Sequence, residues 1–266
     1  MLPVAPRIWV VRENQMSNEL NGKFALVTGG SRGIGAATAK ELAARGATVM
    51  VNYAGNKSAA DAVVDEIASR GGKAIAVQAD VSEESGVVRL FDAIDQNFGG
   101  QLDILVNNAG IYETGAIQEL GVEHFDKTMR INVRAVFLVT HAATQRLRDG
   151  GRIITTGSCI GDSMPFPGGA VYAMSKSAVQ GLTRGWARDL GPRGITVNCV
   201  QPGPIDTDMN PDNEANNPGA MPMRSMTALG RYGKAEEVAA LIGFLAGPTA
   251  SYLTGSMLTV DGGFNA

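Results

Sequence analysis

The chain has little of what disulfide frameworks and metal sites require. Its 266 residues include only two cysteines, Cys159 and Cys199, and two histidines, His124 and His141. Two distant cysteines do not make a disulfide framework, and the sequence has no C-x-x-C pair that could bind zinc. Neither histidine has a ligand partner at metal-binding spacing, so we expect no resident metal.

Strong charge and long apolar runs are also missing. The 23 Lys and Arg residues against 26 Asp and Glu residues give a formal charge of −3. This slightly acidic balance gives no reason to expect a nucleic-acid polymer or an anionic membrane as partner. The apolar run at residues 8–11 is too short for a signal sequence or a membrane span. We therefore expect a cytoplasmic protein in which residues 1–19 form a flexible N-terminal extension.

Short apolar runs and helix-length amphipathic stretches alternate from Lys23 onwards. The runs predict strands at 24–28, 47–52, 73–78, 102–107, 151–156, 194–200 and 257–261. The stretches between them predict helices at 33–45, 57–70, 83–98, 123–147, 170–190 and 235–246. Strands that are apolar throughout and alternate with helices are typical of a parallel sheet covered on both faces. The sequence therefore predicts the α/β class, with one doubly wound Rossmann domain at 20–266 and a seven-stranded parallel sheet with helices on both faces.

Residues 203–232 interrupt this alternation. The segment is rich in Pro, Asn and Met and has no strong period. It follows a predicted strand, so it should leave the sheet at the carboxyl edge, where ligands bind in doubly wound folds. It is either a mobile surface insertion or a functional loop. We favour a substrate lid with short helices, in which Met221, Met223 and Met226 form a flexible apolar wall.

A glycine-rich turn follows the first predicted strand and opens a helix. It reads Thr28-Gly29-Gly30-Ser31-Arg32-Gly33-Ile34-Gly35. Glycines let a pyrophosphate approach the helix N-terminus, where free N–H groups and the helix dipole favour an anion. The spacing G-x-x-x-G-x-G differs from the standard dinucleotide fingerprint, and glycine-rich turns also serve simply to reverse a chain. Its position in the α/β pattern favours a dinucleotide site.

The end of the second predicted strand indicates which dinucleotide is bound. An NAD site usually places Asp or Glu there to bind the ribose 2′-hydroxyl. This chain has Asn52 followed by Tyr53, so no carboxylate would repel a 2′-phosphate. Arg32 can offer its guanidinium to that phosphate, unless it is merely a solvated loop arginine. The sequence therefore predicts NADP(H) as the cofactor.

Three further residues are candidates for proton and carbonyl chemistry. Tyr172 and Lys176 share one face of a predicted helix, and a nearby cation should lower the tyrosine pKa from about 10 towards neutral. Tyr172 could then act as a general acid or base, although most such pairs are simple surface contacts. Ser158 ends the fifth predicted strand, and its hydroxyl could donate to a carbonyl oxygen as negative charge develops there.

Asn132 lies inside the long helix predicted at 123–147. An asparagine in a helix interior is locally unfavourable, because its side chain competes with the backbone for hydrogen bonds. It is either an exposed polar residue of that helix or part of a site.

Together these motifs resemble the short-chain dehydrogenase/reductase family. The resemblance extends over residues 20–266, with the motifs in the family's order. It rests on Thr28-Gly29-x-x-x-Gly33-x-Gly35, Asn107-Asn108-Ala109-Gly110, Asn132, Ser158, Tyr172-x-x-x-Lys176 and Pro202-Gly203. It implies that Tyr172 donates a proton, that Lys176 lowers its pKa and holds the nicotinamide ribose, and that Ser158 polarises a carbonyl. Asn132 would anchor a water in a proton relay.

The resemblance also implies the cofactor contacts. Asp80 and Val81 would contact the adenine, and residues 108–110 would line the ribose. The nicotinamide would be flanked by Pro202, Gly203, Ile205 and Thr207. The full predicted set is Gly29, Ser31, Arg32, Gly33, Ile34, Gly35, Asn52, Tyr53, Asp80, Val81, Asn108, Ala109, Gly110, Tyr172, Lys176, Pro202, Gly203, Ile205 and Thr207. In one departure, Ser158 stands fourteen residues before Tyr172, one more than the commonest spacing in the family. Members of the family also assemble, so a homotetramer or dimer is expected.

Three functions remain open at this point. The leading one is NADP(H)-dependent, reversible reduction of a small ketone or aldehyde to an alcohol. The sequence also resembles the cyclic-di-GMP-binding biofilm-dispersal members of the family, in which the fold acts mainly as a binding module. Reduction of 3-oxoacyl thioesters, as in the 3-oxoacyl carrier-protein reductases, would favour a basic patch, for which Arg224 and Arg231 are candidates. The complete set of Ser158, Tyr172 and Lys176 favours an enzyme over a binder.

Overall fold

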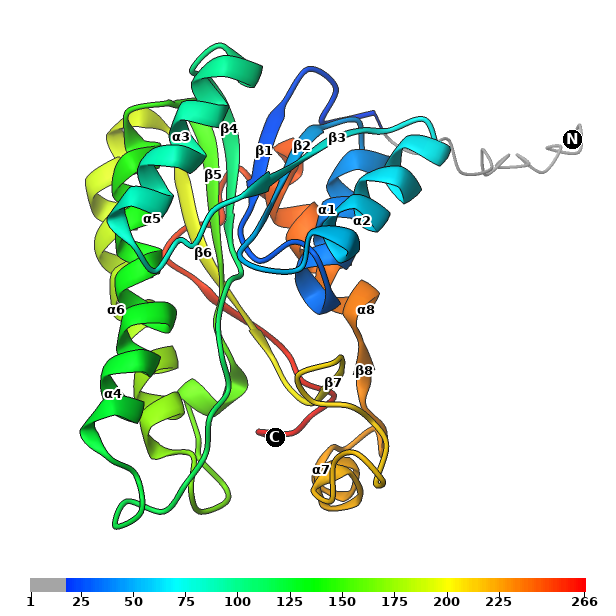
Figure 1. Cartoon of the computed structure of the whole chain (residues 1–266), viewed down its shortest axis with the longest axis vertical. Coiled ribbons are helices and arrows are strands. Elements are labelled where there is room, and N and C mark those ends of the chain that lie inside the picture. The colour runs from blue at the N-terminus through cyan, green and yellow to red at the C-terminus, as the bar shows by residue number, and fades with distance from the viewer. Residues whose placement is uncertain (1–17) are drawn as a thin grey trace, which may run out of the picture.

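A seven-stranded parallel sheet with the order β3-β2-β1-β4-β5-β6-β9 runs through the middle of the molecule (Figure 1). The strands are β1 (Phe24–Val27), β2 (Thr48–Tyr53), β3 (Lys73–Gln78), β4 (Leu102–Asn107), β5 (Leu147–Thr156), β6 (Thr196–Pro202) and β9 (Met257–Val260). This arrangement confirms the predicted fold class. The computed structural model describes residues 18–266, so the extension predicted at 1–19 lies almost wholly outside the described residues. Glu19, at its end, forms an ion pair of 2.6 Å with Arg45.

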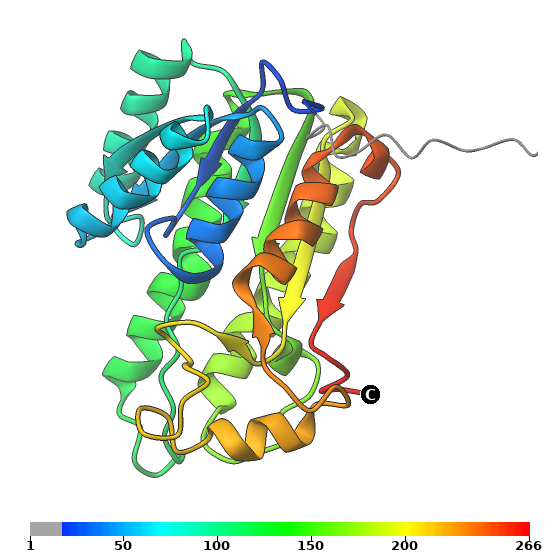
Figure 2. The same cartoon turned by 90° about the vertical axis from the view of Figure 1, so that its right-hand side faces the viewer.

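Helices cover both faces of the sheet (Figure 1 and Figure 2). One layer contains α1 (Gly33–Ala44), α2 (Lys57–Ser69) and α8 (Ala235–Ala246), and the other contains α3 (Glu84–Phe98), α5 (Ala135–Thr144) and α6 (Ala170–Leu190). Successive strand residues point to opposite layers. Val27 and Val106 belong to the core under α1 and α8, whereas Leu26 and Leu105 belong to the core under α3 and α5. The strands are apolar throughout because both of their faces are buried.

The winding of the sheet reverses at β1. This strand pairs with β2 on one side and with β4 on the other. In doubly wound sheets, ligands bind at this point of reversal, outside the carboxyl ends of the strands. Thr28 directly follows β1 and Asn108 directly follows β4, so both residues lie at that point.

The helix predicted at 123–147 is divided by a π-helical turn. It consists of α4 (Val122–Met129), the π-helical residues Arg130–Arg134, and α5. Its predicted end is wrong, because β5 already begins at Leu147. π-helical turns are rare and frequently mark functional sites. Asn132, at the centre of this turn, is only 1% exposed, so its interpretation as an exposed polar residue is wrong.

The segment 203–232 contains the predicted short helix, α7 (Ala220–Met226), at the carboxyl edge of the sheet (Figure 1). It also contains β7 (Ile205–Asp206), which pairs with β8 (Gly233–Lys234). Short 3-10 turns lie at Cys159–Gly161, Gly191–Arg193 and Pro248–Ala250. Within residues 18–266, no helix has both the length and the apolar character needed to cross a membrane.

Candidate active site

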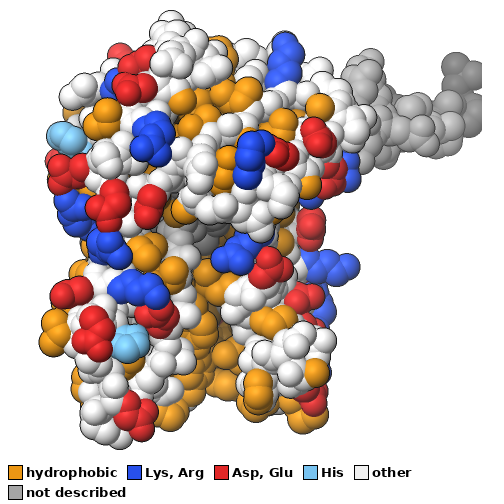
Figure 3. Space-filling view, in the orientation of Figure 1, with side chains coloured by type: hydrophobic (Ala, Val, Ile, Leu, Met, Phe, Trp, Pro, Cys, Tyr) orange, Lys and Arg blue, Asp and Glu red, His pale blue; other side chains and the backbone are white. Residues whose placement is uncertain are grey.

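A cavity of about 560 Å³ opens at the carboxyl edge of the sheet. Figure 3 shows that the hollow between the α4 and α7 regions is lined mainly by apolar side chains. The predicted site residues that line the cavity are Gly29, Ser31, Arg32, Gly33, Ile34, Gly35, Asn52, Tyr53, Asp80, Val81, Asn108, Ala109, Gly110, Ser158, Tyr172, Lys176, Pro202, Gly203, Ile205 and Thr207. The fold therefore brings all of them together except Asn132, which lies behind the cavity wall.

Hydrogen bonds join the glycine-rich loop to the end of β4. The Thr28 hydroxyl oxygen accepts the N–H of Asn108 at 3.0 Å and the N–H of Ala109 at 3.1 Å. The side-chain amide of Asn108 donates to the carbonyl oxygens of Thr28 and Gly29, both at 3.1 Å. A Cβ atom on Gly35 would lie only 2.3 Å from the Gly29 carbonyl oxygen. Glycine is therefore required at position 35 for the loop to pack against the helix.

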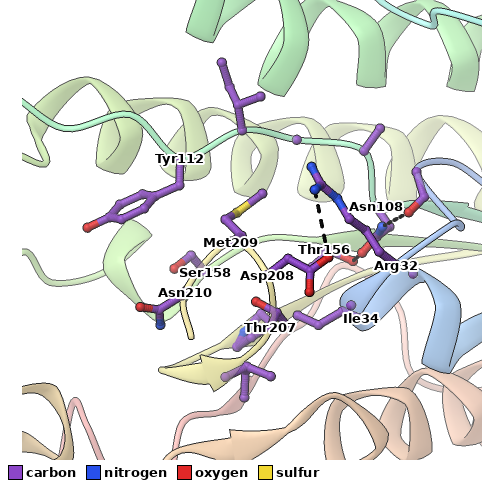
Figure 4. A pocket seen from close by; sticks show the side chains of 18 of the residues that line it. Arg32, Ile34, Asn108, Tyr112, Thr156, Ser158, Thr207, Asp208, Met209 and Asn210 are labelled. Carbon is purple, nitrogen blue, oxygen red and sulfur yellow. Dashed lines mark hydrogen bonds and ion pairs between the residues drawn. The ribbon is translucent and has the colours of Figure 1, made fainter. Parts of the chain in front are cut away.

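The N-terminus of α1 offers a binding place for an anion. The helix starts at Gly33 with no side-chain cap and no acidic residue in its first turn. Its first N–H groups therefore have no partner within the helix and, with the helix dipole, favour a negative charge. The Arg32 side chain beside them is 67% exposed, and its Nη1 lies 3.9 Å from Asp208 Oδ2 (Figure 4). Such an exposed pair is weak, so Arg32 can turn to another anion at little cost.

Asn52 lines the cavity but uses its amide group to hold the backbone. It is 1% exposed, its Oδ1 accepts the N–H of Gly29 at 3.4 Å, and its Nδ2 donates to the Ala79 carbonyl oxygen at 2.9 Å. These bonds tie the glycine-rich loop to the segment after β3. The end of β2 therefore presents no carboxylate to the cavity.

Ser158, Tyr172 and Lys176 meet in one wall of the cavity. Lys176 Nζ donates to the Thr156 carbonyl oxygen at 2.9 Å and lies 5.6 Å from the centre of the Tyr172 ring. The Ser158 hydroxyl lies near the Tyr172 phenol, and both residues line the cavity. The ring of Tyr112 packs edge-on against Tyr172, with 4.8 Å between the ring centres. A hydroxyl, a phenol and an ammonium are thus presented together to anything bound in the cavity.

Burial controls the ionisation of these groups. It raises the pKa of Tyr172 above the ordinary value of 10.0, and the nearby Ser158 side chain opposes this only in part. Burial also lowers the pKa of Lys176 to about 8. The prediction that Lys176 brings the pKa of Tyr172 towards neutral is wrong for this structure, because desolvation is the largest influence on the phenol. At neutral pH Tyr172 therefore keeps its proton, which is the form that a proton donor requires.

Asn132 connects the segment after β4 to α6. Its Oδ1 accepts the N–H of Ile111 at 2.9 Å, and its Nδ2 donates to the Ile111 carbonyl oxygen at 3.0 Å. The same Nδ2 contacts the Ser175 hydroxyl at 3.1 Å. Ser175 lies between Tyr172 and Lys176 on α6, so the π-helical turn fixes this part of the helix against the cavity wall.

The apolar part of the cavity was largely missed by sequence analysis. It is lined by Tyr112, Ile160, Phe166, Met209, Met223 and Phe264. Of the three methionines predicted to form a wall, only Met223 lines the cavity, and Met221 is 58% exposed. Tyr112 could have been found, because it follows the Asn-Ala-Gly turn after β4 by two residues. No local signal marks Phe264, and its neighbour Asn265 donates to the Cys159 carbonyl oxygen at 2.7 Å.

Comparisons with known proteins find similar sequences and structures over almost the whole chain. A family model described as enoyl-(acyl carrier protein) reductase matches residues 29–265. The cyclic-di-GMP-binding biofilm dispersal mediator protein of Escherichia coli (strain K12) is 46% identical over 92% of this chain and 98% of its own length. A 3-oxoacyl-[acyl-carrier-protein] reductase of a Synechocystis species is 45% identical over 92% of this chain and 97% of its own length. A short-chain dehydrogenase from Burkholderia cenocepacia, solved in complex with NADP, is 51% identical with a TM-score of 0.89, over 93% of this chain and 100% of its own.

Cys159 lines the cavity beside Ser158, yet we expect it to be unreactive. Burial raises its pKa to about 12 and that of Cys199 to about 11. The reactive form is the thiolate, and at about pH 8 only about one Cys159 thiol in ten thousand would be ionised. Iodoacetamide should therefore leave both cysteines of the native protein unlabelled by mass spectrometry and label both in guanidinium. Equally fast labelling of Cys159 in both states would contradict this assignment.

Proposed function

The chain belongs to the short-chain dehydrogenase/reductase family, and we propose that it is an NADP(H)-dependent oxidoreductase that reduces a ketone or aldehyde to an alcohol. The observation that carries this proposal is one cavity that contains both an uncapped helix N-terminus and the group of Ser158, Tyr172 and Lys176. The first feature suits a dinucleotide and the second suits the reduction of a carbonyl group.

The residues around the glycine-rich loop fit NADP(H). The N-terminus of α1 would hold the pyrophosphate, and the exposed guanidinium of Arg32 would hold the 2′-phosphate. With Asn52 at its end, β2 itself presents no carboxylate to that phosphate. The complex of the Burkholderia relative with NADP supports the same cofactor. When bound, the cofactor supplies the hydride, and the protein supplies position, proton and electrostatics.

Tyr172 is the proposed proton donor. Its raised pKa keeps the phenol protonated throughout the neutral range, and the proton would pass to the carbonyl oxygen. The Ser158 hydroxyl would donate a hydrogen bond to the same oxygen as negative charge develops there. Lys176 Nζ, held by the Thr156 carbonyl oxygen, would stabilise the phenolate that forms when the proton leaves.

The cavity favours an uncharged substrate. Among the described residues that line it, the charged ones are Arg32, Asp80, Lys176 and Asp208. Arg32 and Lys176 already have roles in this proposal, so no cation remains to bind a substrate carboxylate. The aromatic and sulfur-containing side chains that also line the cavity suit an apolar carbonyl compound.

The structure gives less support to a substrate carried on an acyl carrier. Arg224 is bound to Asp212 at 2.5 Å and to Glu214 at 3.3 Å. Arg231 makes two contacts of 2.8 Å with the carboxylate of Glu237. Both arginines considered for a carrier phosphate are therefore engaged in ion pairs, and neither lines the cavity.

Tyr172→Phe removes only the phenolic hydroxyl and should lower kcat for carbonyl reduction at least about 100-fold, because general acid catalysis is lost. The Kd for NADPH should change less than about twofold. Both are measured with purified protein, kcat from the absorbance of NADPH with a panel of uncharged ketones and aldehydes. Tyr252→Phe is the matched control, since that side chain is fully exposed. Turnover retained in Tyr172→Phe would overturn the assigned role.

Arg32→Ala should raise the Kd for NADPH about tenfold or more and leave the Kd for NADH nearly unchanged, because only NADPH has the 2′-phosphate. Titration calorimetry with both cofactors measures the difference. Arg89→Ala, at an exposed arginine on α3, is the control for the loss of a positive charge. Equal weakening of both cofactors would show that Arg32 does not select NADPH.

A second candidate function is the binding of a cyclic dinucleotide, which the name and the 46% identity of the Escherichia coli relative favour. This ligand also carries two phosphates, so the α1 N-terminus and Arg32 would serve it as well. We therefore expect cyclic-di-GMP and NADPH to exclude one another in a competition titration, and Arg32→Ala to weaken both. If cyclic-di-GMP does not bind in the absence of NADPH, this candidate is wrong.

A further inference from the structure

The turn that carries Ser158 ends at an aspartate outside the cavity. Ser158 precedes the 3-10 turn Cys159–Gly161, and Asp162 follows it. The carboxylate of Asp162 accepts one hydrogen bond on each oxygen, from Gln180 Nε2 at 2.8 Å and from Gln201 Nε2 at 2.8 Å. Both glutamines are buried, at 6% and 1% exposure. Asp162 is not among the cavity-lining residues, so it does not act on a bound molecule directly.

Gln201 holds both ends of this turn. Besides its bond to Asp162, its Nε2 donates to the Ser158 carbonyl oxygen at 3.3 Å. Its Oε1 accepts a hydrogen bond from the Thr259 hydroxyl at 3.4 Å. Gln201 lies in β6 and Thr259 in β9, so the turn is fixed to two strands of the central sheet.

Gln180 holds the turn to the helix that carries the proton donor. Tyr172, Lys176 and Gln180 follow one another at four-residue intervals, which places them on one face of α6. The turn packs directly on that face, because a Cβ atom on Gly161 would lie 2.8 Å from Gln180 Nε2. The Ser177 hydroxyl also donates to the Gly161 carbonyl oxygen at 2.6 Å.

We propose that Asp162 is a positioning residue, whose carboxylate joins α6 to β6 across the Ser158 turn and so sets the spacing between the Ser158 hydroxyl and the Tyr172 phenol. The inference rests on the proposed function, since it concerns the geometry of the proposed proton donor. Hydrogen bonds from amides to a carboxylate are stronger than those between neutral groups. Displacement of a reacting group by about 1 Å can slow a reaction about 100-fold.

The test is a double-mutant cycle. Asp162→Asn places an amide N–H₂ group against the amide donor of either Gln180 or Gln201, which breaks one of the two hydrogen bonds. We therefore expect kcat to fall about tenfold. The KM for the carbonyl substrate and the Kd for NADPH should change less than about twofold. Gln180→Glu alone places a second carboxylate against that of Asp162, and their repulsion should also lower kcat. In the double variant, the new amide at position 162 can donate to the new carboxylate at position 180, while its oxygen accepts from Gln201. Turnover should then return to within about threefold of the wild type.

Asp189→Asn, at an exposed aspartate of the same helix, is the matched control and should keep wild-type turnover. An active wild type whose kcat is unchanged by Asp162→Asn would overturn the inference. So would a double variant no better than the product of its two single changes, because that result means that the residues act independently.

Amide hydrogen exchange tests the same contact without a substrate. Asp162→Asn should speed exchange of the backbone amides at 159–162 about tenfold, and the added Gln180→Glu change should restore their protection. If the wild type reduces no carbonyl compound, the proposed function fails. The exchange rates then still test whether Asp162 fixes the Ser158 turn. Exchange that is the same in wild type and Asp162→Asn would show that the carboxylate does not fix the turn.

Discussion

The candidate site depends on two backbones lying side by side at the carboxyl ends of β1 and β4. Thr28 and Asn108 exchange hydrogen bonds across this junction, which leaves no space for larger groups between the segments. A Cβ atom on Gly29 would lie 2.9 Å from the Cα atom of Ala109. This close contact places the N-terminus of α1 in the same cavity as Ser158, Tyr172 and Lys176, so the anion-binding place and these polar groups share one rigid frame.

The phenol and the ammonium of the site are placed by one regular element, α6. α6 supplies the phenol and the ammonium from one face, and the buried amides of Asn132, Gln180 and Gln201 tie that helix to its surroundings. Buried polar networks of this kind are costly when incomplete but specify one geometry when all members are paired. The effect of desolvation is visible at Lys176, whose pKa burial lowers to about 8.

Periodic features of the sequence predicted the architecture well, because strands buried on both faces leave an unbroken apolar signal. The glycine-rich loop and the pair of Tyr172 and Lys176 were found because their spacing is local. The π-helical turn was not, since the partners of Asn132 are 21 and 43 residues away along the chain. The raised pKa of Tyr172 was also missed, because burial is a property of the folded molecule and not of neighbouring residues. For the same reason, the bonding of Asn52 to the backbone could not be predicted.

Phe264 makes the cavity depend on a segment that is far in sequence from the other residues lining it. The parallel sheet pairs segments far apart in sequence, and β6 acquires its outer neighbour only when residues 257–260 arrive. Phe264 then completes the wall and Asn265 secures the backbone of Cys159. The buried residues of the two main core clusters lie between Leu20 and Ala250, so this core does not need Phe264, whereas the cavity wall does. The chamber is complete only when residues 264–265 are packed in place, so a bound ligand should stabilise the docking of this segment as well as the rest of the fold.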